Sequence, residues 1–164
     1  MDAGIIAMGH AKKNGVKISL DLSSSNIIES KKEYFMALVT DFVDLLFVNE
    51  EEAASLTGKR RHDALHAIAE IADIAVVKLG EQGSILKHGK EILTIPAYTV
   101  HCIDTTGAGD MYAAGILYGL THGKSLEKSA RIASYAASKV VEQLGARLPT
   151  PLKNQSEMRG LLDE

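Results

Sequence analysis

Strand-like and helix-like segments alternate along this chain of 164 residues, and this alternation limits the possible fold more than any other feature. Short β-branched and apolar runs predict strands, and the longer amphipathic runs between them predict helices. The alternation is typical of a layered, Rossmann-like α/β fold, in which helices flank a largely parallel sheet. We expect strands at 16–22, 45–48, 74–79 and 98–103, a hairpin of strands 83–88 and 91–95, and helices at 3–13, 27–39, 50–56, 61–72, 110–121 and 125–144.

Composition sets the size of the domain and excludes several classes of partner. Hydrophobic residues make up 46% of the chain, so we expect one core and a single α/β domain over residues 1–164. The formal charge of −3 and the lack of a long basic stretch argue against a nucleic-acid partner. No apolar stretch is long enough for a bilayer, and the start of the chain does not resemble a secretory signal.

The cysteine content of the chain indicates its compartment. Cys102 is the single cysteine, so an internal disulfide is excluded, which fits a cytoplasmic location. Because Cys102 lies within the predicted strand 98–103, we expect it to be a small, buried core residue rather than a nucleophile.

Polar and small residues follow several of the predicted strands. Asp21, Asn49, Gly80 and Asp104 all come at or just after a predicted strand end. Open α/β sheets bind ligands beyond the carboxyl ends of their strands. The sequence therefore predicts one common binding site that includes these residues.

The run Asp-Thr-Thr-Gly-Ala-Gly-Asp at 104–110 lies between a predicted strand and a predicted helix. Gly107, Ala108 and Gly109 let backbone N–H groups approach a ligand closely, and the following helix start attracts anions. Asp110 would then lie at the mouth of a phosphate site, where a carboxylate can accept a proton from an attacking hydroxyl. The alternative is an aspartate that only caps a helix after a glycine turn.

Asn49 and Glu52 lie three residues apart at the start of the predicted helix 50–56. Their oxygens could hold water ligands of Mg²⁺, which prefers oxygen donors and retains several waters. The same spacing also predicts a capping box, in which Asn49 caps the helix and Glu52 bonds back to the Asn49 N–H. The two roles are compatible, so both remain open.

The 104–110 run resembles the carboxyl-terminal signature of the PfkB, or ribokinase-like, family of carbohydrate kinases. The resemblance implies that Asp110 is the catalytic base and that Gly107, Ala108 and Gly109 form the anion hole for the transferred phosphoryl group. It also places Asp104 near a monovalent-cation (K⁺) site. A carboxylate at a helix start is stabilised in its charged form, so we expect Asp110 to orient the hydroxyl and to accept its proton late.

The resemblance extends beyond this run. It implies that ATP and Mg²⁺ are used, with Asn49 and Glu52 acting in magnesium and phosphate handling. Relatives often carry Asp-x-Asn where this chain has Asp21-Leu22-Ser23. The string at 20–25, together with residues 145–147, looks more like the adenosine-kinase-like branch than the ribokinase branch. The resemblance further implies nucleotide contacts for Lys78, Gly80, Gly83, Thr106 and Ser134.

The resemblance covers only the carboxyl-terminal half of such a kinase. The other half supplies most residues that bind the sugar or nucleoside, together with a lid. We therefore expect either the ATP-binding, catalytic half of a sugar or nucleoside kinase, or a nucleotide-binding or oligomerising module without turnover. A phosphomethylpyrimidine-type kinase is less consistent with the complete 104–110 run. An exposed sheet edge also predicts self-association into a homo-oligomer.

Overall fold

The computed structural model describes residues 3–163, which form two compact units. The first unit comprises residues up to 79 together with 84–94, and the second comprises 80–83 and the residues from 95 onward. Among residues 3–163, no helix is both long and apolar enough to cross a membrane.

The first unit is built on a five-stranded sheet with the strand order β1-β2-β3-β4-β5. Strands β1 (Ser19–Asp21), β2 (Leu45–Asn49) and β3 (Ile74–Lys78) run parallel, and β4 (Ser84–His88) pairs antiparallel with β3. The last strand, β5 (Glu91–Ile95), follows β4 after a turn at Gly89 and Lys90, where Gly89 has a φ of 56°. The predicted mixed α/β sheet and its hairpin are therefore confirmed.

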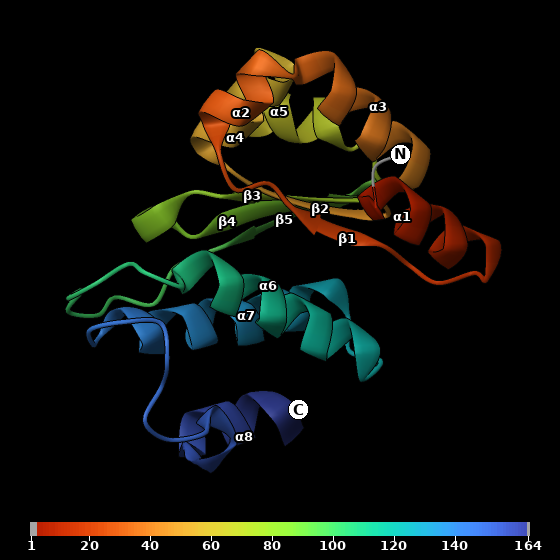
Figure 1. The fold of residues 1–164 in the computed structure, drawn as a ribbon. Coiled ribbons are helices and arrows are strands. Elements are labelled where there is room, and N and C mark those ends of the chain that lie inside the picture. The colour runs from red at the N-terminus through yellow and green to blue at the C-terminus, as the bar shows by residue number, and fades with distance from the viewer. Residues whose placement is uncertain (1–2, 164) are drawn as a thin grey trace. The chain divides into compact units, whose positions relative to one another are not determined.

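Five helices accompany this sheet: α1 (Ala3–Lys13), α2 (Ser25–Ser30), α3 (Lys32–Phe42), α4 (Glu50–Thr57) and α5 (Arg61–Ile68). Figure 1 shows α2 to α5 on one face of the sheet. Their apolar side chains share one core with the sheet, in which Val39, Leu56 and Leu65 are fully buried together with Leu46 and Val77. This burial explains why short strands and helices of eight residues persist.

The second unit is mostly helical. Helices α6 (Ala108–Thr121) and α7 (Leu126–Val141) pack along each other, and α8 (Ser156–Asp163) packs against α7. Close contact between α6 and α7 depends on glycine, because a Cβ at Gly115 would lie 2.9 Å from the Ala133 Cβ. Ser125 caps α7 by accepting a hydrogen bond from the Lys128 N–H at 3.2 Å, as its position in the sequence indicates.

The predicted strand 98–103 is wrong. These residues are irregular, and the Ile103 N–H donates to the Val141 carbonyl at 2.7 Å instead of joining a ladder. Pro96 has no N–H to donate and follows the end of β5 directly. The expected burial of Cys102 is also wrong, because its side chain is exposed.

Several predicted boundaries also change. The predicted helix 27–39 is two helices, because Lys31 between them leaves helical geometry with φ −131° and ψ 36°. The first strand is shorter than 16–22, and Val16 is 56% exposed. Helices α5 and α7 end before residues 72 and 144, respectively. Ends of elements depend on tertiary contacts, which local patterns do not contain.

Candidate functional site

Three polar side chains lie at the carboxyl ends of the three parallel strands. Asp21 ends β1, Asn49 ends β2 and Lys78 ends β3, and Asn49 is paired with Lys78 in the sheet register. Lys78 Nζ donates to both carboxylate oxygens of Asp21, at 2.8 and 2.7 Å. The ion pair is mostly shielded from solvent, with the Lys78 side chain 16% and the Asp21 side chain 28% exposed. The carboxyl edge of the sheet therefore holds an ion pair, in which the Asp21 carboxylate balances the charge of the Lys78 ammonium.

Asn49 and Glu52 form the predicted capping box at the start of α4. Asn49 Oδ1 accepts the Glu52 N–H at 2.9 Å, and Glu52 Oε2 accepts the Asn49 N–H at 2.8 Å. Glu52 is only 5% exposed. Burial raises the pKa of its carboxyl group, and the Asn49 N–H and the Lys78 charge oppose that rise. The second carboxylate oxygen, Oε1, takes no part in the box and is a possible acceptor for a metal-bound water.

The 104–110 run forms a tight turn into α6 in the second unit. Gly107 precedes the helix with φ 82° and ψ 0°, a left-handed conformation that favours glycine. A Cβ at Gly107 would lie 2.5 Å from the Ala146 Cβ, so the turn also needs a residue without a side chain for packing. Two physical reasons thus favour glycine at position 107, while the approach of a ligand to this turn remains a prediction.

The backbone N–H groups of this turn differ in whether they are paired. The Ala108 N–H bonds the Thr105 carbonyl at 3.1 Å. By contrast, the N–H groups of Gly107, Gly109 and Asp110 donate to no group among residues 3–163. Unpaired N–H groups at a helix start, together with the helix dipole, form an anion-binding site. The exposed Asp110 lies in the first turn of the same helix.

Asp104 fixes the beginning of this turn. Its Oδ1 accepts the Thr106 N–H at 2.8 Å and the Thr106 hydroxyl at 2.6 Å, and its Oδ2 accepts the Gly145 N–H at 2.8 Å. These bonds, led by the one from the Thr106 hydroxyl, lower the pKa of Asp104. Thr106 is thus part of the internal structure of the turn, while the expected cation near Asp104 remains a prediction.

The comparisons with known proteins agree with this geometry. A family model described as pfkB family carbohydrate kinase matches residues 2–153. This chain belongs to the pfkB family. The family consists of carbohydrate kinases by its description. Solved relatives confirm the expected ribokinase-like fold.

Three relatives illustrate the similarity. A sugar kinase of Archaeoglobus fulgidus without an assigned substrate is 36% identical over 104 residues, covering 63% of this chain and 42% of that protein. The structure of adenosine kinase from Sinorhizobium meliloti matches with a TM-score of 0.90 and 34% identity, covering 96% of this chain and 49% of that one. A fructokinase from Vibrio cholerae, solved with fructose, ADP and a calcium ion, matches with a TM-score of 0.80 and 26% identity over 97% of this chain and 55% of that one.

This pfkB-family chain spans about half the length of these relatives, since it covers between 42% and 55% of them. The relatives also differ in the acceptor that their names give, from adenosine to fructose. The relatives of this chain are therefore kinases, but family membership does not identify which acceptor this chain would use.

The remaining residues that the resemblance connects with nucleotide have structural roles that sequence reasoning did not identify. Gly83 has a φ of 89°, and a Cβ there would lie 2.7 Å from the Ala97 nitrogen. Its N–H bonds the Gly80 carbonyl at 3.0 Å, closing a single turn of 3₁₀ helix. Ser134 is buried on α7, and its hydroxyl donates to the Pro96 carbonyl at 2.9 Å. Their contacts with a nucleotide remain predictions.

Two features of the pfkB-family site were missed from sequence. One is the bond from the Gly145 N–H to Asp104, across 41 positions. The other is the ion pair of Asp21 and Lys78, across 57 positions. Residues 145–147 and the position of Asp21 at a strand end were noted in the sequence. Their contacts with Asp104 and Lys78 could not be predicted, because the sequence does not show which distant residues lie close together.

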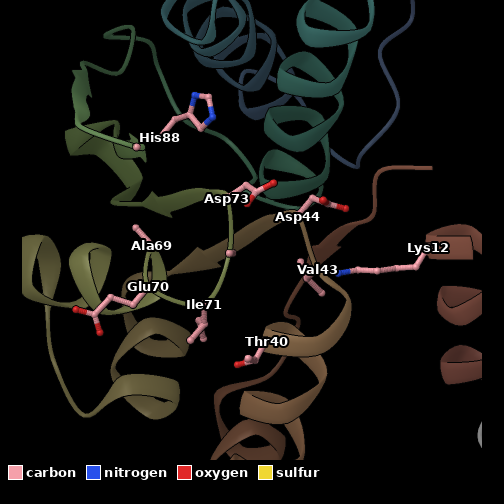
Figure 2. Close-up of a pocket in the computed structure, with 11 residues that line it drawn as sticks. Lys12, Thr40, Val43, Asp44, Ala69, Glu70, Ile71, Asp73 and His88 are labelled. Carbon is pink, nitrogen blue, oxygen red and sulfur yellow. The ribbon is translucent and has the colours of Figure 1, made fainter. Parts of the chain in front are cut away.

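A hollow of about 440 Å³ also occurs in the first unit, but at the other edge of the sheet (Figure 2). Asp44 and Asp73 line it, and they directly precede β2 and β3. Lys17 Nζ bonds both carboxylates, at 2.6 Å to Asp44 and 3.1 Å to Asp73. The hollow therefore lies at the amino ends of the parallel strands, away from the edge where such sheets bind ligands.

Proposed function

We propose that this chain is the nucleotide-binding and phosphoryl-transfer part of a kinase that uses ATP to phosphorylate a hydroxyl group of a sugar or nucleoside. The observation that carries the proposal is the turn at 104–110. It presents three unpaired N–H groups, at Gly107, Gly109 and Asp110, next to an exposed carboxylate. The N–H groups would bind a phosphoryl oxyanion, and the carboxylate would accept a hydrogen bond from an acceptor hydroxyl.

In the proposed reaction, the acceptor hydroxyl oxygen forms a bond to the γ-phosphorus of ATP. The bond between that phosphorus and the β–γ bridging oxygen breaks, and ADP leaves with the electron pair. The Asp110 carboxylate takes the hydroxyl proton, and the N–H groups of the turn stabilise the negative charge on the phosphoryl oxygens. Because transition states of phosphoryl transfer are loose, positioning and charge stabilisation provide most of the acceleration.

Magnesium fits the donors that this chain offers. Among residues 3–163, no group of three or more His, Cys, Asp or Glu side chains is placed to hold a metal ion directly. Mg²⁺ is commonly held through a few carboxylates, waters and substrate phosphates rather than a complete protein cage. Glu52 and Asn49 would hold its waters, and the ion would neutralise charge on the phosphates. The Vibrio cholerae fructokinase was solved with ADP and a calcium ion, which supports the use of a divalent cation together with a nucleotide.

A nucleotide-binding module without turnover is the second candidate, because the chain spans about half of its relatives. ATP binding separates both candidates from a fragment that only folds. Isothermal titration calorimetry with Mg–ATP should show saturable binding by the folded chain, and failure to bind any nucleotide would contradict both candidates.

Substitution of Asp110 tests the catalytic assignment. In an assay of ATP-dependent phosphorylation against a panel of sugars and nucleosides, Asp110→Asn should lower turnover by about 10²–10⁴-fold, because the proton acceptor is lost. ATP affinity should change little. Asp41→Asn, an exposed aspartate on α3, is the matched control and should retain full turnover. Undiminished turnover in Asp110→Asn would remove Asp110 from the mechanism, and no turnover by the unsubstituted chain despite ATP binding would favour the module.

A further inference from the structure

The ion pair at the carboxyl edge of the sheet joins two strands that are not neighbours. Strand β2 lies between β1 and β3 in the sheet. The Lys78 side chain nevertheless reaches Asp21, so the pair extends past the end of β2, where Asn49 begins the cap of α4. Half-buried ion pairs with two short bonds hold a flexible lysine side chain in one geometry.

The Lys78 ammonium is not fully used by this pair. An ammonium has three N–H donors. The two carboxylate oxygens of Asp21 accept from it at 2.8 and 2.7 Å, and no other partner of the Lys78 side chain occurs among residues 3–163. The side chain is 16% exposed, so one donor remains available to a ligand oxygen.

The surroundings of Lys78 indicate that the ion pair does more than stabilise the fold. Glu52, which is 5% exposed, feels the charges of both Lys78 and Asp21. A second carboxylate thus lies within electrostatic range of the ion pair, at an edge where the strands themselves are mostly apolar. Replacing a buried ion pair by apolar residues is often neutral or stabilising, so stability alone does not explain this arrangement.

We infer that Asp21 is a positioning residue that holds Lys78 in place to bind a phosphate oxygen of the nucleotide. The inference rests on the proposed function and extends it to a residue outside the 104–110 turn. The Asp21 carboxylate and a phosphate are both negatively charged and repel each other, so Asp21 would act on the phosphate through Lys78. A double-mutant cycle of the two residues tests this coupling.

The test is calorimetric binding of ATP, ADP and adenosine to the full chain and its variants. Lys78→Met and Asp21→Asn should each weaken ATP binding by about 10-fold, through loss of one charge-assisted contact or its geometry. The Asp21→Asn substitution should have no further effect in the Lys78→Met background. Adenosine binding should not change in any variant. Lys78→Arg keeps the charge and a forked contact with Asp21, and it should retain most of the ATP affinity.

Asp44→Asn is the matched control, because it breaks the ion pair with Lys17 at the opposite edge of the sheet. It should leave ATP affinity unchanged. Circular dichroism and urea unfolding identify any variant that does not fold, and Asp21→Glu provides a second carboxylate variant in that case. Additive effects of the two substitutions, or equal losses for adenosine and ATP, would overturn this inference alone. Absence of ATP binding by the unsubstituted chain would overturn the proposed function as well.

Discussion

At the scale of single residues, Gly107 combines a left-handed backbone with close packing, whereas Gly145 has only the left-handed backbone. Gly145 has a similar φ of 79°, but a Cβ there would meet nothing within 4 Å, whereas a Cβ at Gly107 would meet Ala146. Comparing alanine at the two positions therefore separates the conformational penalty from the steric one.

Gly145→Ala should lower the free energy of unfolding by about 1–2 kcal/mol, the penalty of a left-handed alanine. Gly107→Ala should lower it further and should also weaken ATP binding, because the turn must shift away from Ala146. Urea unfolding and calorimetry measure the two effects. The double variant Gly107→Ala with Ala146→Gly should recover part of the stability loss, and equal losses for both single variants would show that packing against Ala146 is unimportant.

Residue patterns predicted a local contact of the candidate site, but not its long-range contacts. The capping box of Asn49 and Glu52 follows from local spacing and is confirmed. The exposure of Cys102 and the partner of Lys78 were not predictable, because each depends on the spatial order of distant segments. Short-range patterns carry information on caps and turns, whereas long-range pairs need the topology of the sheet.

At the scale of elements, the packing of α6 against α7 depends on a row of small residues. A Cβ at Gly115 would lie 2.9 Å from the Ala133 Cβ, and one at Gly119 would lie 2.7 Å from the Ser129 Cβ. Gly115→Ala should therefore lower the free energy of unfolding by about 1–3 kcal/mol through overpacking, although alanine favours helices. Urea unfolding measures the change.

Gly160→Ala on α8 is the control for this prediction, since a Cβ there would meet nothing within 4 Å. It should raise stability by up to about 1 kcal/mol, the helix-propensity gain of alanine over glycine. A similar gain for Gly115→Ala would contradict close contact between the two helices.

The elements themselves were predicted to different degrees. The alternation of strands and helices indicated the correct α/β class, and the hairpin turn at Gly89 and Lys90 was located correctly. Residues 98–103 have the composition of a strand but join no ladder of the sheet, and sequence pattern does not show whether a pairing partner exists. The break at Lys31 likewise occurs without a proline or glycine, so the local sequence does not mark it.

At the scale of the whole molecule, stability should depend on pH through Asp44. Its carboxylate links Lys17 to the start of β2, and it accepts the Ile18 N–H at 2.8 Å. Burial acts to raise the pKa of Asp44, but the bonds from Lys17 and Ile18 outweigh it, so the pKa is lowered from its ordinary 3.8. The folded state therefore binds this proton less readily than the unfolded state, and the stabilisation exists above about pH 4 and is lost as pH falls below it.

Asp44→Asn should lower the free energy of unfolding by about 1–2 kcal/mol near neutral pH, mainly by weakening the bond to the Ile18 N–H. The difference from the unsubstituted chain should shrink at about pH 3. Urea unfolding at both pH values measures it, with Asp41→Asn as an exposed control. A difference that stays constant on acidification would show that the charge of Asp44 does not contribute.

The irregular course of residues 98–103 has a practical consequence. It leaves the thiol of Cys102 exposed, and Cys102 is the single cysteine of the chain. A maleimide dye would therefore react at one known position without any substitution. That position lies two residues before Asp104, where the glycine turn begins, so fluorescence from the dye can follow events at the turn in real time.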